Sequence, residues 1–359
     1  MKTMKVIGLM SGTSLDGLDI AYIEFNFDTD EEILNYHIIH SKSYPYSIDF
    51  IQELEHSTQI PVVSFLQLDK KIGHVFGQLV NSFVSEFNID TNDVNCIASH
   101  GQTTFHQPEK GFTSQIGCGD TIAILTGIPV VNDFRTKDVI LGGQGAPLVP
   151  IGDFKLFNKE AQSFLNLGGI ANISFKKENK IIAFDICPAN LPLNSLTKKH
   201  FNLDYDQNGD LAKSGEVNWE LYNKLNELNF YSESYPKSLG TEWLEENFNP
   251  LIHSSKQAPL NLLSTIIEHE AYQISKILND HHLDSVFITG GGAFNHFMIE
   301  RLKFHYKGKV IIPNSTIIEF KEALVFGFLG ALYLNKKENL LCSVTGASRD
   351  SIGGVLHLP

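Results

Sequence analysis

The stretch GLMSGTSLDGLD, residues 8–19, says most about the fold of this chain. An apolar run, Met4–Met10, leads into it and an alternating run, Asp19–Phe25, follows it, which predicts a strand, a tight turn and a second strand. Glycines let the backbone come close to a ligand, and turn N–H groups with Ser and Thr hydroxyls could cradle a polyphosphate. The candidate phosphate-binding residues are Gly12, Thr13, Ser14, Leu15, Asp16, Gly17, Leu18 and Asp19.

Two better-known phosphate loops are excluded by spacing. The stretch lacks G-x-x-x-x-G-K-[ST], so it is not a Walker loop, and it lacks G-x-G-x-x-G and does not open a helix, so it is not a dinucleotide fingerprint. A glycine-rich hairpin that serves only the fold is the alternative. Because folding does not require this cluster of hydroxyls and glycines, the cluster points to function.

The stretch resembles the signature of the anhydro-N-acetylmuramic acid kinases, which belong to the sugar kinase/Hsp70/actin superfamily. The resemblance continues through the motifs below over nearly the whole chain. It implies an α/β fold with two ribonuclease-H-like domains of the actin-like ATPase type flanking a nucleotide cleft. It also implies ATP and Mg²⁺ as cofactors, with Mg²⁺ partly carried through water on Asp16, and a homodimer.

Composition restricts the class of protein. With 359 residues, 42% of them hydrophobic and 19% charged, the chain reads as soluble and globular and is long enough for two cores. The net charge of −13 argues against nucleic acid and anionic membranes as partners. We find no membrane-spanning apolar run, signal peptide, disulfide framework or zinc spacing in the sequence, so we expect a cytoplasmic protein.

Strand-type runs alternate with helical runs, which predicts the α/β class. The strand–glycine turn–strand pattern of residues 4–25 recurs at 164–175, which indicates two similar halves, with a glycine-rich crossover around 142–147. We expect one domain at 1–135 with a C-terminal tail at about 336–359, and a second at 136–335 with a helical insertion at about 218–261. The expected strands are Met4–Met10, Asp19–Phe25, Val94–Ser99, Pro129–Asn132, Phe164–Leu167, Asn172–Phe175, Lys180–Asp185, Ser285–Thr289 and Val310–Pro313; the expected helices include Phe65–Phe87, Leu260–Leu278 and Phe320–Leu334.

Two further glycine turns could contact a nucleotide. In NLGGIAN, residues 166–172, Gly168, Gly169 and Asn172 are candidates for phosphate contacts, and a structural hairpin is the alternative. In TGGGAFN, residues 289–295, three glycines between a strand and a helix would let a flat ligand lie against the backbone. The resemblance makes this third turn, with Gly290, Gly291 and Gly292, an adenosine-binding element.

The segment SHGQTTFH, residues 99–106, places polar side chains at the end of a strand, where α/β proteins place ligand groups. The spacing of His100 and His106 does not fit a metal site. By resemblance, His100, Gln102 and Thr103 line a sugar pocket; hydrogen-bonded loop residues are the alternative.

Arg135 follows a short strand and could pair bidentately with a carboxylate. The substrate of the family carries a lactyl carboxylate, so the resemblance supplies a partner; an ion pair with Asp133 or Asp138 is the alternative. Asp120, Asp133 and Glu322 are further candidates for sugar contacts. Glu322 is expected to open the last helix, where an interaction with the helix dipole is the alternative.

Asp185 ends an apolar strand in the segment AFDICPAN, residues 183–190, and a carboxylate there is either a turn cap or a reactive group. Phosphoryl transfer needs a base that aligns and deprotonates the attacking oxygen. By resemblance, Asp185 matches the catalytic aspartate of the family, which activates water.

This segment departs from the family pattern Asp-x-Gly-Pro-Gly-Asn-x-Leu-x-Asp. Cys187 and Ala189 replace the two glycines, Pro192 replaces the leucine and Asn194 replaces the last aspartate, whereas Asp185, Pro188 and Asn190 are kept. Fewer glycines restrict the backbone beside the base. Either the turn is repacked with function intact, which we favour because the other motifs are present, or activity is lost or redirected.

The sequence therefore predicts an ATP-dependent kinase that opens 1,6-anhydro-N-acetylmuramic acid with water and phosphorylates O6, giving N-acetylmuramic acid 6-phosphate in cell-wall recycling. The hydrolytic step follows from the resemblance alone. Two alternatives stay open: a kinase of another sugar, and a catalytically altered paralogue that acts as a nucleotide-dependent sensor.

Overall fold

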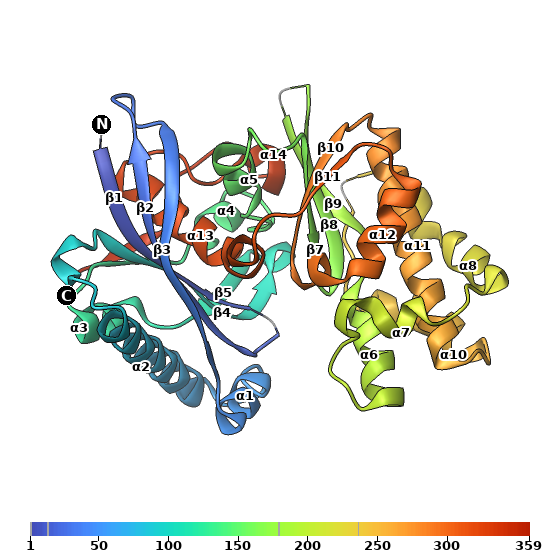
Figure 1. Cartoon of the computed structure of the whole chain (residues 1–359). Helices are drawn as coiled ribbons and strands as arrows, with labels where there is room; N and C mark the ends of the chain where they lie inside the picture. Colours follow the sequence, from blue (N-terminus) through green and yellow to red (C-terminus); the bar gives the residue numbers. More distant parts are fainter. Residues whose placement is uncertain (1, 13, 179, 236) are drawn as a thin grey trace. The chain divides into compact units, whose positions relative to one another are not determined.

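The computed structural model describes residues 2–12, 14–178, 180–235 and 237–359 (Figure 1). The chain forms two compact units, one of Met1–Phe157 with Phe320–Pro359 and one of Asn158–Glu319. Each unit combines a mixed sheet with helices, which confirms the predicted α/β class.

The sheet of the first unit starts with an antiparallel meander, β1–β2–β3, and β4 then pairs parallel with β1. Strand β6 continues parallel to β4, β12 pairs antiparallel with β6, and β5 forms a hairpin with the far end of β4. The strands are β1 (Lys2–Ser11), β2 (Gly17–Phe27), β3 (Ile33–Pro45), β4 (Cys96–Gln107), β5 (Phe112–Ile116), β6 (Val130–Asn132) and β12 (Val355–His357).

The helices of this unit are α1 (Ile48–Glu55), α2 (Val62–Glu86), α3 (Gly119–Thr126), α4 (Thr136–Ile140), α5 (Pro150–Leu156), α14 (Cys342–Thr345) and the part of α13 (Ser315–Leu334) from Phe320 onward, with 3₁₀ turns at Thr91–Asp93 and Pro108–Lys110. Helix α13 lies directly against the sheet, because a Cβ atom on Gly8 of β1 would come 1.9 Å from the carbonyl oxygen of Ala323. Only a strand residue without a side chain permits this approach.

The sheet of the second unit has the order β11-β10-β7-β8-β9, in which β7, β8 and β9 form an antiparallel meander and β10 and β11 add parallel strands. The strands are β7 (Ser163–Leu167), β8 (Ile170–Lys177), β9 (Lys180–Pro188), β10 (Ser285–Thr289) and β11 (Lys309–Ile311). The helices are α6 (Asn190–Phe201), α7 (Asp210–Lys213), α8 (Trp219–Asn226), α9 (Thr241–Trp243), α10 (Asn249–Ser254), α11 (Pro259–Asp280) and α12 (His296–His305), with 3₁₀ turns at Gln207–Gly209, Asn229–Ser232 and Gly291–Phe294 and a π-helical turn at Leu244–Phe248.

The two units share one topology. An antiparallel meander is followed by two parallel strands on the side of its first strand, as β3-β2-β1-β4-β6 in one unit and β9-β8-β7-β10-β11 in the other. The turn after β1 and the turn after β7 therefore occupy corresponding places. The sequence indicated this duplication only through the two strand–turn–strand patterns.

The limits of the compact units differ from the expected domain limits of 135/136 and 335/336, since they fall at 157/158 and 319/320. Packing explains the difference. Gly152 of α5 lies against Val325 of α13, and the buried Asp153 forms an ion pair with Lys321 at 2.7 Å. These contacts join α5 and most of α13 to the first sheet. Residues 218–261 are largely helical, in α8, α9 and α10.

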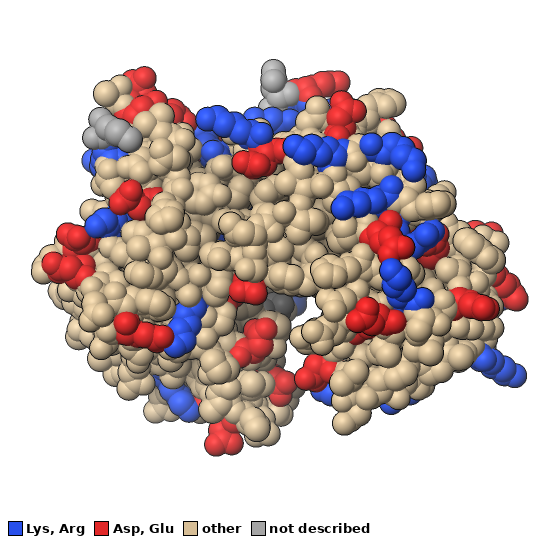
Figure 2. Space-filling model, in the orientation of Figure 1, with Lys and Arg blue, Asp and Glu red and all other residues tan. Residues whose placement is uncertain are grey.

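Most of the expected strands and helices are present, and β3, β5 and β12 were not anticipated. β3 is an edge strand, and most of its residues are at least partly exposed. Because its sequence is polar, the pattern of hydrophobic residues does not predict it. Among the helices of the described residues, none has the length and apolar character that crossing a bilayer requires. Acidic and basic side chains are interspersed over the face shown in Figure 2.

Candidate functional site

The turn between β1 and β2 is open and polar. Ser14 donates a hydrogen bond from Oγ to Oδ1 of Asp16 at 2.8 Å, and both side chains are exposed. Leu15 has φ +57°, and its N–H donates to the carbonyl of Gly12 at 3.3 Å. A Cβ atom on Gly12 would meet no atom closer than 3.6 Å, which leaves room beside its backbone. The predicted contact of Thr13 lies outside the described residues.

A buried hydroxyl network anchors the start of this turn. Ser11, at the end of β1, donates to Oε1 of Gln102 at 2.5 Å. Tyr46 lies 2.7 Å from the same hydroxyl, and burial raises the pKa of Tyr46, so its O–H stays protonated and donates to Ser11. Gln102 thus stabilises the start of the turn, and its amide oxygen already accepts a hydrogen bond from Ser11. Tyr46 lies beyond the predicted motifs, and no sequence pattern pointed to it.

The segment from Ser99 to His106 is strand throughout, because β4 continues to Gln107 and pairs with β5, so the alternative of loop residues does not hold. A β-bulge interrupts its pairing with β1: Leu9 faces Ser99 and Ser11 faces Gln102, so two residues of β4 oppose one of β1. Gly101 adopts φ +77° in the bulge. Such a bulge redirects a side chain, here that of the buried His100.

His100 contacts Arg135 rather than the open surface. The Nδ1 atom lies 2.9 Å from the carbonyl of Gly101, which makes it the protonated nitrogen. Nε2 then accepts hydrogen bonds from Nε and Nη2 of Arg135 at 3.1 and 2.9 Å. Burial and the nearby charge of Arg135 lower the pKa of His100 to about 3, so the ring is neutral.

The third guanidinium nitrogen of Arg135, Nη1, donates a hydrogen bond to the carbonyl of Gly145 at 2.7 Å. The alternative ion pairs with Asp133 and Asp138 are not formed: Asp133 accepts from the N–H of Thr136 at 3.3 Å, and Asp138 accepts from Gly145 N–H and Thr345 Oγ1. Burial lowers the pKa of Arg135 to about 10, so it stays charged while its hydrogen bonds go to neutral acceptors. The charges of Glu322 and Asp138 act on the guanidinium group, but neither carboxylate forms an ion pair with it.

Glu322 is not at the start of a helix as expected, because α13 begins seven residues earlier, at Ser315. An interaction with the helix N-terminus is therefore ruled out. Protein atoms around the exposed carboxyl group of Glu322 reduce its hydration, and this raises its pKa. The positive charges of Lys321 and Arg135 act in the opposite direction and lower the pKa. Asp120, another candidate, pairs with His357 at 2.6 Å.

In the second unit, three predicted motifs meet at one end of the sheet. The carbonyls of Gly168 and Gly169 accept hydrogen bonds from the N–H groups of Asn190 and Ala189. Asn190 also donates from Nδ2 to the carbonyl of Leu167 at 3.0 Å. The turn after β7 and the end of the Asp185 segment are thereby joined.

The third glycine turn packs onto the same place. Gly290, at φ +82°, leaves no room for a Cβ atom, which would lie 2.5 Å from Oδ1 of Asn166. Gly291 faces open space, since a Cβ atom there would meet nothing closer than Nδ2 of Asn190 at 3.9 Å. Gly290 thus brings the turn against β7, and Gly291 leaves a vacant strip of backbone. The helix α12 follows, with Asn295 capping the N–H of Met298.

Asp185 lies in β9, opposite Asn172 of β8 and beside a bulge. One carboxylate oxygen, Oδ2, accepts a hydrogen bond from the N–H of Leu239 at 2.8 Å; among the described residues Oδ1 has no hydrogen-bond partner. Burial raises the pKa of Asp185, and the Leu239 N–H partly opposes the rise. A partly buried carboxylate that is oriented by one oxygen and open at the other suits a general base.

Cys187 and Ala189, which replace the two glycines of the family pattern, do not adopt a left-handed backbone conformation. Cys187 is fully buried and does not have positive φ, and Ala189 has φ −131° and is also buried. Neither residue therefore has the left-handed φ that favours glycine. Asn194 is exposed on α6.

A buried polar group near Cys187 was not foreseen. Tyr231 is hydrogen-bonded to Nε2 of His269 at 2.8 Å, and Glu270 is buried with Oε1 lacking a partner among the described residues. Burial raises the pKa of Glu270 and of Cys187 well above their usual values, so both are neutral. A neutral, buried thiol is a packed side chain and not a nucleophile.

Within the residues that the structure describes, no three or more His, Cys, Asp or Glu side chains are grouped to hold an ion. His106 contacts Thr113 at 3.0 Å, away from any such group. The exposed carboxylate of Asp16, an oxygen donor beside open backbone, suits a hydrated Mg²⁺ ion.

Comparison with known proteins identifies relatives over the full length. The family model described as anhydro-N-acetylmuramic acid kinase matches residues 4–359. The anhydro-N-acetylmuramic acid kinase of Aliivibrio fischeri is 35% identical, covering 98% of this chain and 99% of the relative. That of Legionella pneumophila is 34% identical, covering 98% and 97%. Among solved structures, the chain aligns with component A of the (R)-2-hydroxyglutaryl-CoA dehydratase of Acidaminococcus fermentans at 10% identity and a TM-score of 0.43. The alignment covers 89% of this chain and 95% of that protein. So distant a likeness does not bear on function.

Proposed function

The chain belongs to the anhydro-N-acetylmuramic acid kinase family, and we propose that it phosphorylates O6 of 1,6-anhydro-N-acetylmuramic acid with ATP while water opens the 1,6-anhydro bond. The product is N-acetylmuramic acid 6-phosphate, an intermediate of cell-wall recycling. The observation that carries this proposal is the family match over residues 4–359, which includes every motif discussed above.

Asp185 is assigned as the base. Its Oδ1 takes a proton from water, the water oxygen bonds to the anomeric carbon, and the bond from that carbon to O6 breaks. O6 then captures the γ-phosphoryl group and ADP leaves. The hydrogen bond from Leu239 to Oδ2 supports the assignment, because it orients the carboxylate, and the raised pKa brings its basicity closer to neutral pH.

Arg135 is assigned to the lactyl carboxylate of the sugar. A charged guanidinium whose hydrogen bonds go to neutral acceptors can form an ion pair with an incoming carboxylate. Thr103, Asp133 and Glu322 are proposed to contact the sugar hydroxyl groups. His100 and Gln102 act through their hydrogen-bonded neighbours, Arg135 and Ser11.

The nucleotide contacts are assigned to backbone. In the first unit the turn from Gly12 to Asp19 is proposed to contact the phosphates, with Mg²⁺ held through water on Asp16. A magnesium ion there would neutralise charge on the phosphate oxygens. In the second unit Gly168, Gly169 and Asn172 are proposed to contact phosphates, and Gly290, Gly291 and Gly292 to contact the adenosine. The vacant backbone at Gly291 supports this assignment.

The test is a coupled assay of ADP release with ATP, Mg²⁺ and 1,6-anhydro-N-acetylmuramic acid, against a no-sugar control and a panel of other sugars. Release that depends on this sugar alone is expected. A reaction in ¹⁸O-water should place label at C1 of the product. Release with another sugar and no label would indicate direct attack by a hydroxyl group, and ATP binding without release would indicate a sensor.

A further inference from the structure

An irregular segment of the second unit, residues 237–240, lies against the edge of the sheet at Asp185. Strand β9, which carries Asp185, is the edge strand that follows β8. The N–H of Asp185 donates to the carbonyl of Lys237 at 3.2 Å. Two residues further along the segment, the N–H of Leu239 donates to Oδ2 of Asp185 at 2.8 Å. Segment 237–240 therefore holds both the backbone and the carboxylate of Asp185.

Apolar contacts hold the chain on both sides of Lys237. The ring of Tyr235 stacks on that of Phe184, the residue before Asp185, with the ring centroids 5.5 Å apart and the planes inclined by 10°. Leu239 is buried in the core of the second unit. Burial of apolar surface is not directional, whereas a hydrogen bond requires that its donor point at its acceptor. These contacts therefore place the segment near β9 without fixing the direction of the Leu239 N–H.

The side chain of Lys237 adds a directional contact. Its Nζ donates to the carbonyl of Phe230 at 2.9 Å and lies 4.3 Å from the centroid of the Phe230 ring. Phe230 is buried in the 3₁₀ turn Asn229–Ser232, and its ring contacts that of Trp243. The ammonium group thus ties segment 237–240 to a fixed point of the core.

The half-buried position of the Lys237 side chain is unfavourable for an ammonium group. Burial lowers the pKa of Lys237; Glu233 opposes this shift, and Lys276 of α11 adds to it. The thiol of Cys187 on β9 also acts on Lys237. The carbonyl oxygen and the ring face of Phe230 replace part of the lost hydration, so these two contacts determine where the ammonium group can lie.

We propose that Lys237 is a positioning residue for the base Asp185. By tying its segment to Phe230, the ammonium group keeps the Leu239 N–H directed at Oδ2, which leaves Oδ1 turned toward the attacking water. A carboxylate that is held in this orientation before the reaction needs no reorientation during it. Lys237 has this role only if Asp185 is the base, so the inference rests on the proposed function.

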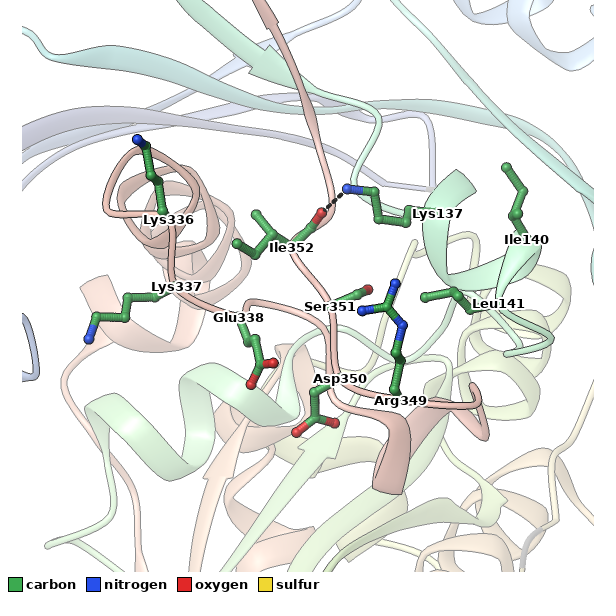
Figure 3. A pocket seen from close by; sticks show the side chains of 10 residues that line it. All are labelled: Lys137, Ile140, Leu141, Lys336, Lys337, Glu338, Arg349, Asp350, Ser351 and Ile352. Atoms are coloured by element: carbon green, nitrogen blue, oxygen red, sulfur yellow. Dashed lines mark hydrogen bonds between the residues drawn. The ribbon is translucent and has the colours of Figure 1, made fainter.

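The test is the kinetics of Lys237→Met, which keeps the aliphatic chain and loses the ammonium group. We expect kcat to fall about tenfold, the scale of one hydrogen bond from a charged group, and KM for the sugar and for ATP to stay within about twofold. Lys237→Arg, which retains a charged donor, should recover part of kcat. Lys336→Met is the matched control and should turn over normally, because Lys336 is an exposed residue that lines a surface hollow of the first unit (Figure 3).

The pH profile separates positioning from a general loss of stability. Burial raises the pKa of Asp185, and the Leu239 N–H lowers it. Without that N–H the carboxylate takes up a proton at higher pH, so the acid limb of kcat should move up by about half a pH unit in Lys237→Met. A variant that is only less stable would melt earlier and keep the limb in place. An unchanged limb, or a loss confined to KM, would overturn the proposal.

Failure of the proposed reaction and failure of this inference give different results. If the unaltered protein releases no ADP with the sugar, the proposed reaction fails, but ¹³C NMR of the Asp185 carboxyl group against pH still measures its pKa in both proteins. A higher pKa in Lys237→Met would show that Lys237 orients Asp185, and an equal pKa would overturn the inference. Thermal melting establishes that each variant is folded.

Discussion

The guanidinium group of Arg135 donates two hydrogen bonds to a single nitrogen atom of His100, Nε2, at 3.1 and 2.9 Å. A protonated imidazole could not accept them. The neutral state of His100 is maintained by burial and by the arginine itself, and the other ring nitrogen is held by the carbonyl of Gly101. His100 is thus a positioning residue that keeps the planar Arg135 side chain in one orientation.

Replacing His100 should therefore affect sugar binding more than the chemical step. We expect His100→Phe, which removes the acceptor, to raise KM for the sugar about tenfold, the scale of one hydrogen bond to a charged group. kcat should change less, and His100→Gln, which keeps an acceptor, should recover part of the loss. Steady-state kinetics with varied sugar measure both constants. A loss confined to kcat would contradict the positioning role.

The two buried histidines, His100 and His269, should each lower the stability of the protein in acid, below about pH 6.5. Burial lowers the pKa of both His100 and His269 to about 3 in the folded state. The unfolded chain binds these protons near pH 6.5, so the contribution of the two histidines to stability falls as pH drops from about 6.5 toward 3. The carboxyl groups of Glu270, Asp185 and Glu322, whose pKa values desolvation raises, act in the opposite direction, so the histidine contribution is isolated by comparison with a variant. Each histidine contributes up to ~1.4 kcal/mol per pH unit. Chemical denaturation at a series of pH values should show a shallower slope in His100→Gln than in the unaltered protein.

Asp185→Asn should reduce kcat by about 10²–10⁴-fold, the loss typical of a general base, with ATP affinity retained. Asparagine can still accept the hydrogen bond from Leu239, so the fold should persist. Asp204→Asn, which alters an exposed carboxylate of the same unit, is the matched control and should turn over normally. Near-normal turnover of Asp185→Asn would remove Asp185 from the mechanism.

Restoring glycine at position 187 should not increase activity. Because Cys187 does not occupy a left-handed conformation, Cys187→Gly relieves no strain; it removes a buried side chain and adds backbone freedom worth about 0.5–1 kcal/mol. We expect a lower melting temperature. We expect kcat to stay within about twofold of the original value, because the substitution does not alter contacts with the transition state. A large gain in kcat would show instead that the altered turn limits catalysis.

Two adjacent glycines should respond differently to alanine. Gly290→Ala should destabilise the fold, because the new Cβ would lie 2.5 Å from Asn166 Oδ1 at a positive φ. Gly291→Ala should leave the melting temperature nearly unchanged but raise KM for ATP, since its methyl group would fill the vacant strip assigned to the adenosine. Melting curves and ATP kinetics of the two variants check both statements. Unchanged ATP binding by Gly291→Ala would exclude that assignment.

Local sequence determined the elements, and with them most of the candidate motifs. Periodicity located α2 and α11 and the strands that enter each glycine turn, because the buried face of a helix or strand imposes its repeat on neighbouring residues. The pattern around Gly168 also indicated the internal duplication. It could not reveal that Gly168, Asn190 and Gly290 meet, since their contacts join segments far apart in the chain.

Tertiary structure alone decided the partners of the polar side chains. The sequence placed His100 and Arg135 in separate motifs, and the bulge at Gly101 brought them into contact. It likewise could not predict the Leu239 N–H on Asp185, or which unit most of α13 joins. Periodic burial can be recognised from residues that are neighbours in the sequence. A long-range hydrogen bond depends on the positions and directions of two groups, and these are set only when the whole chain has packed.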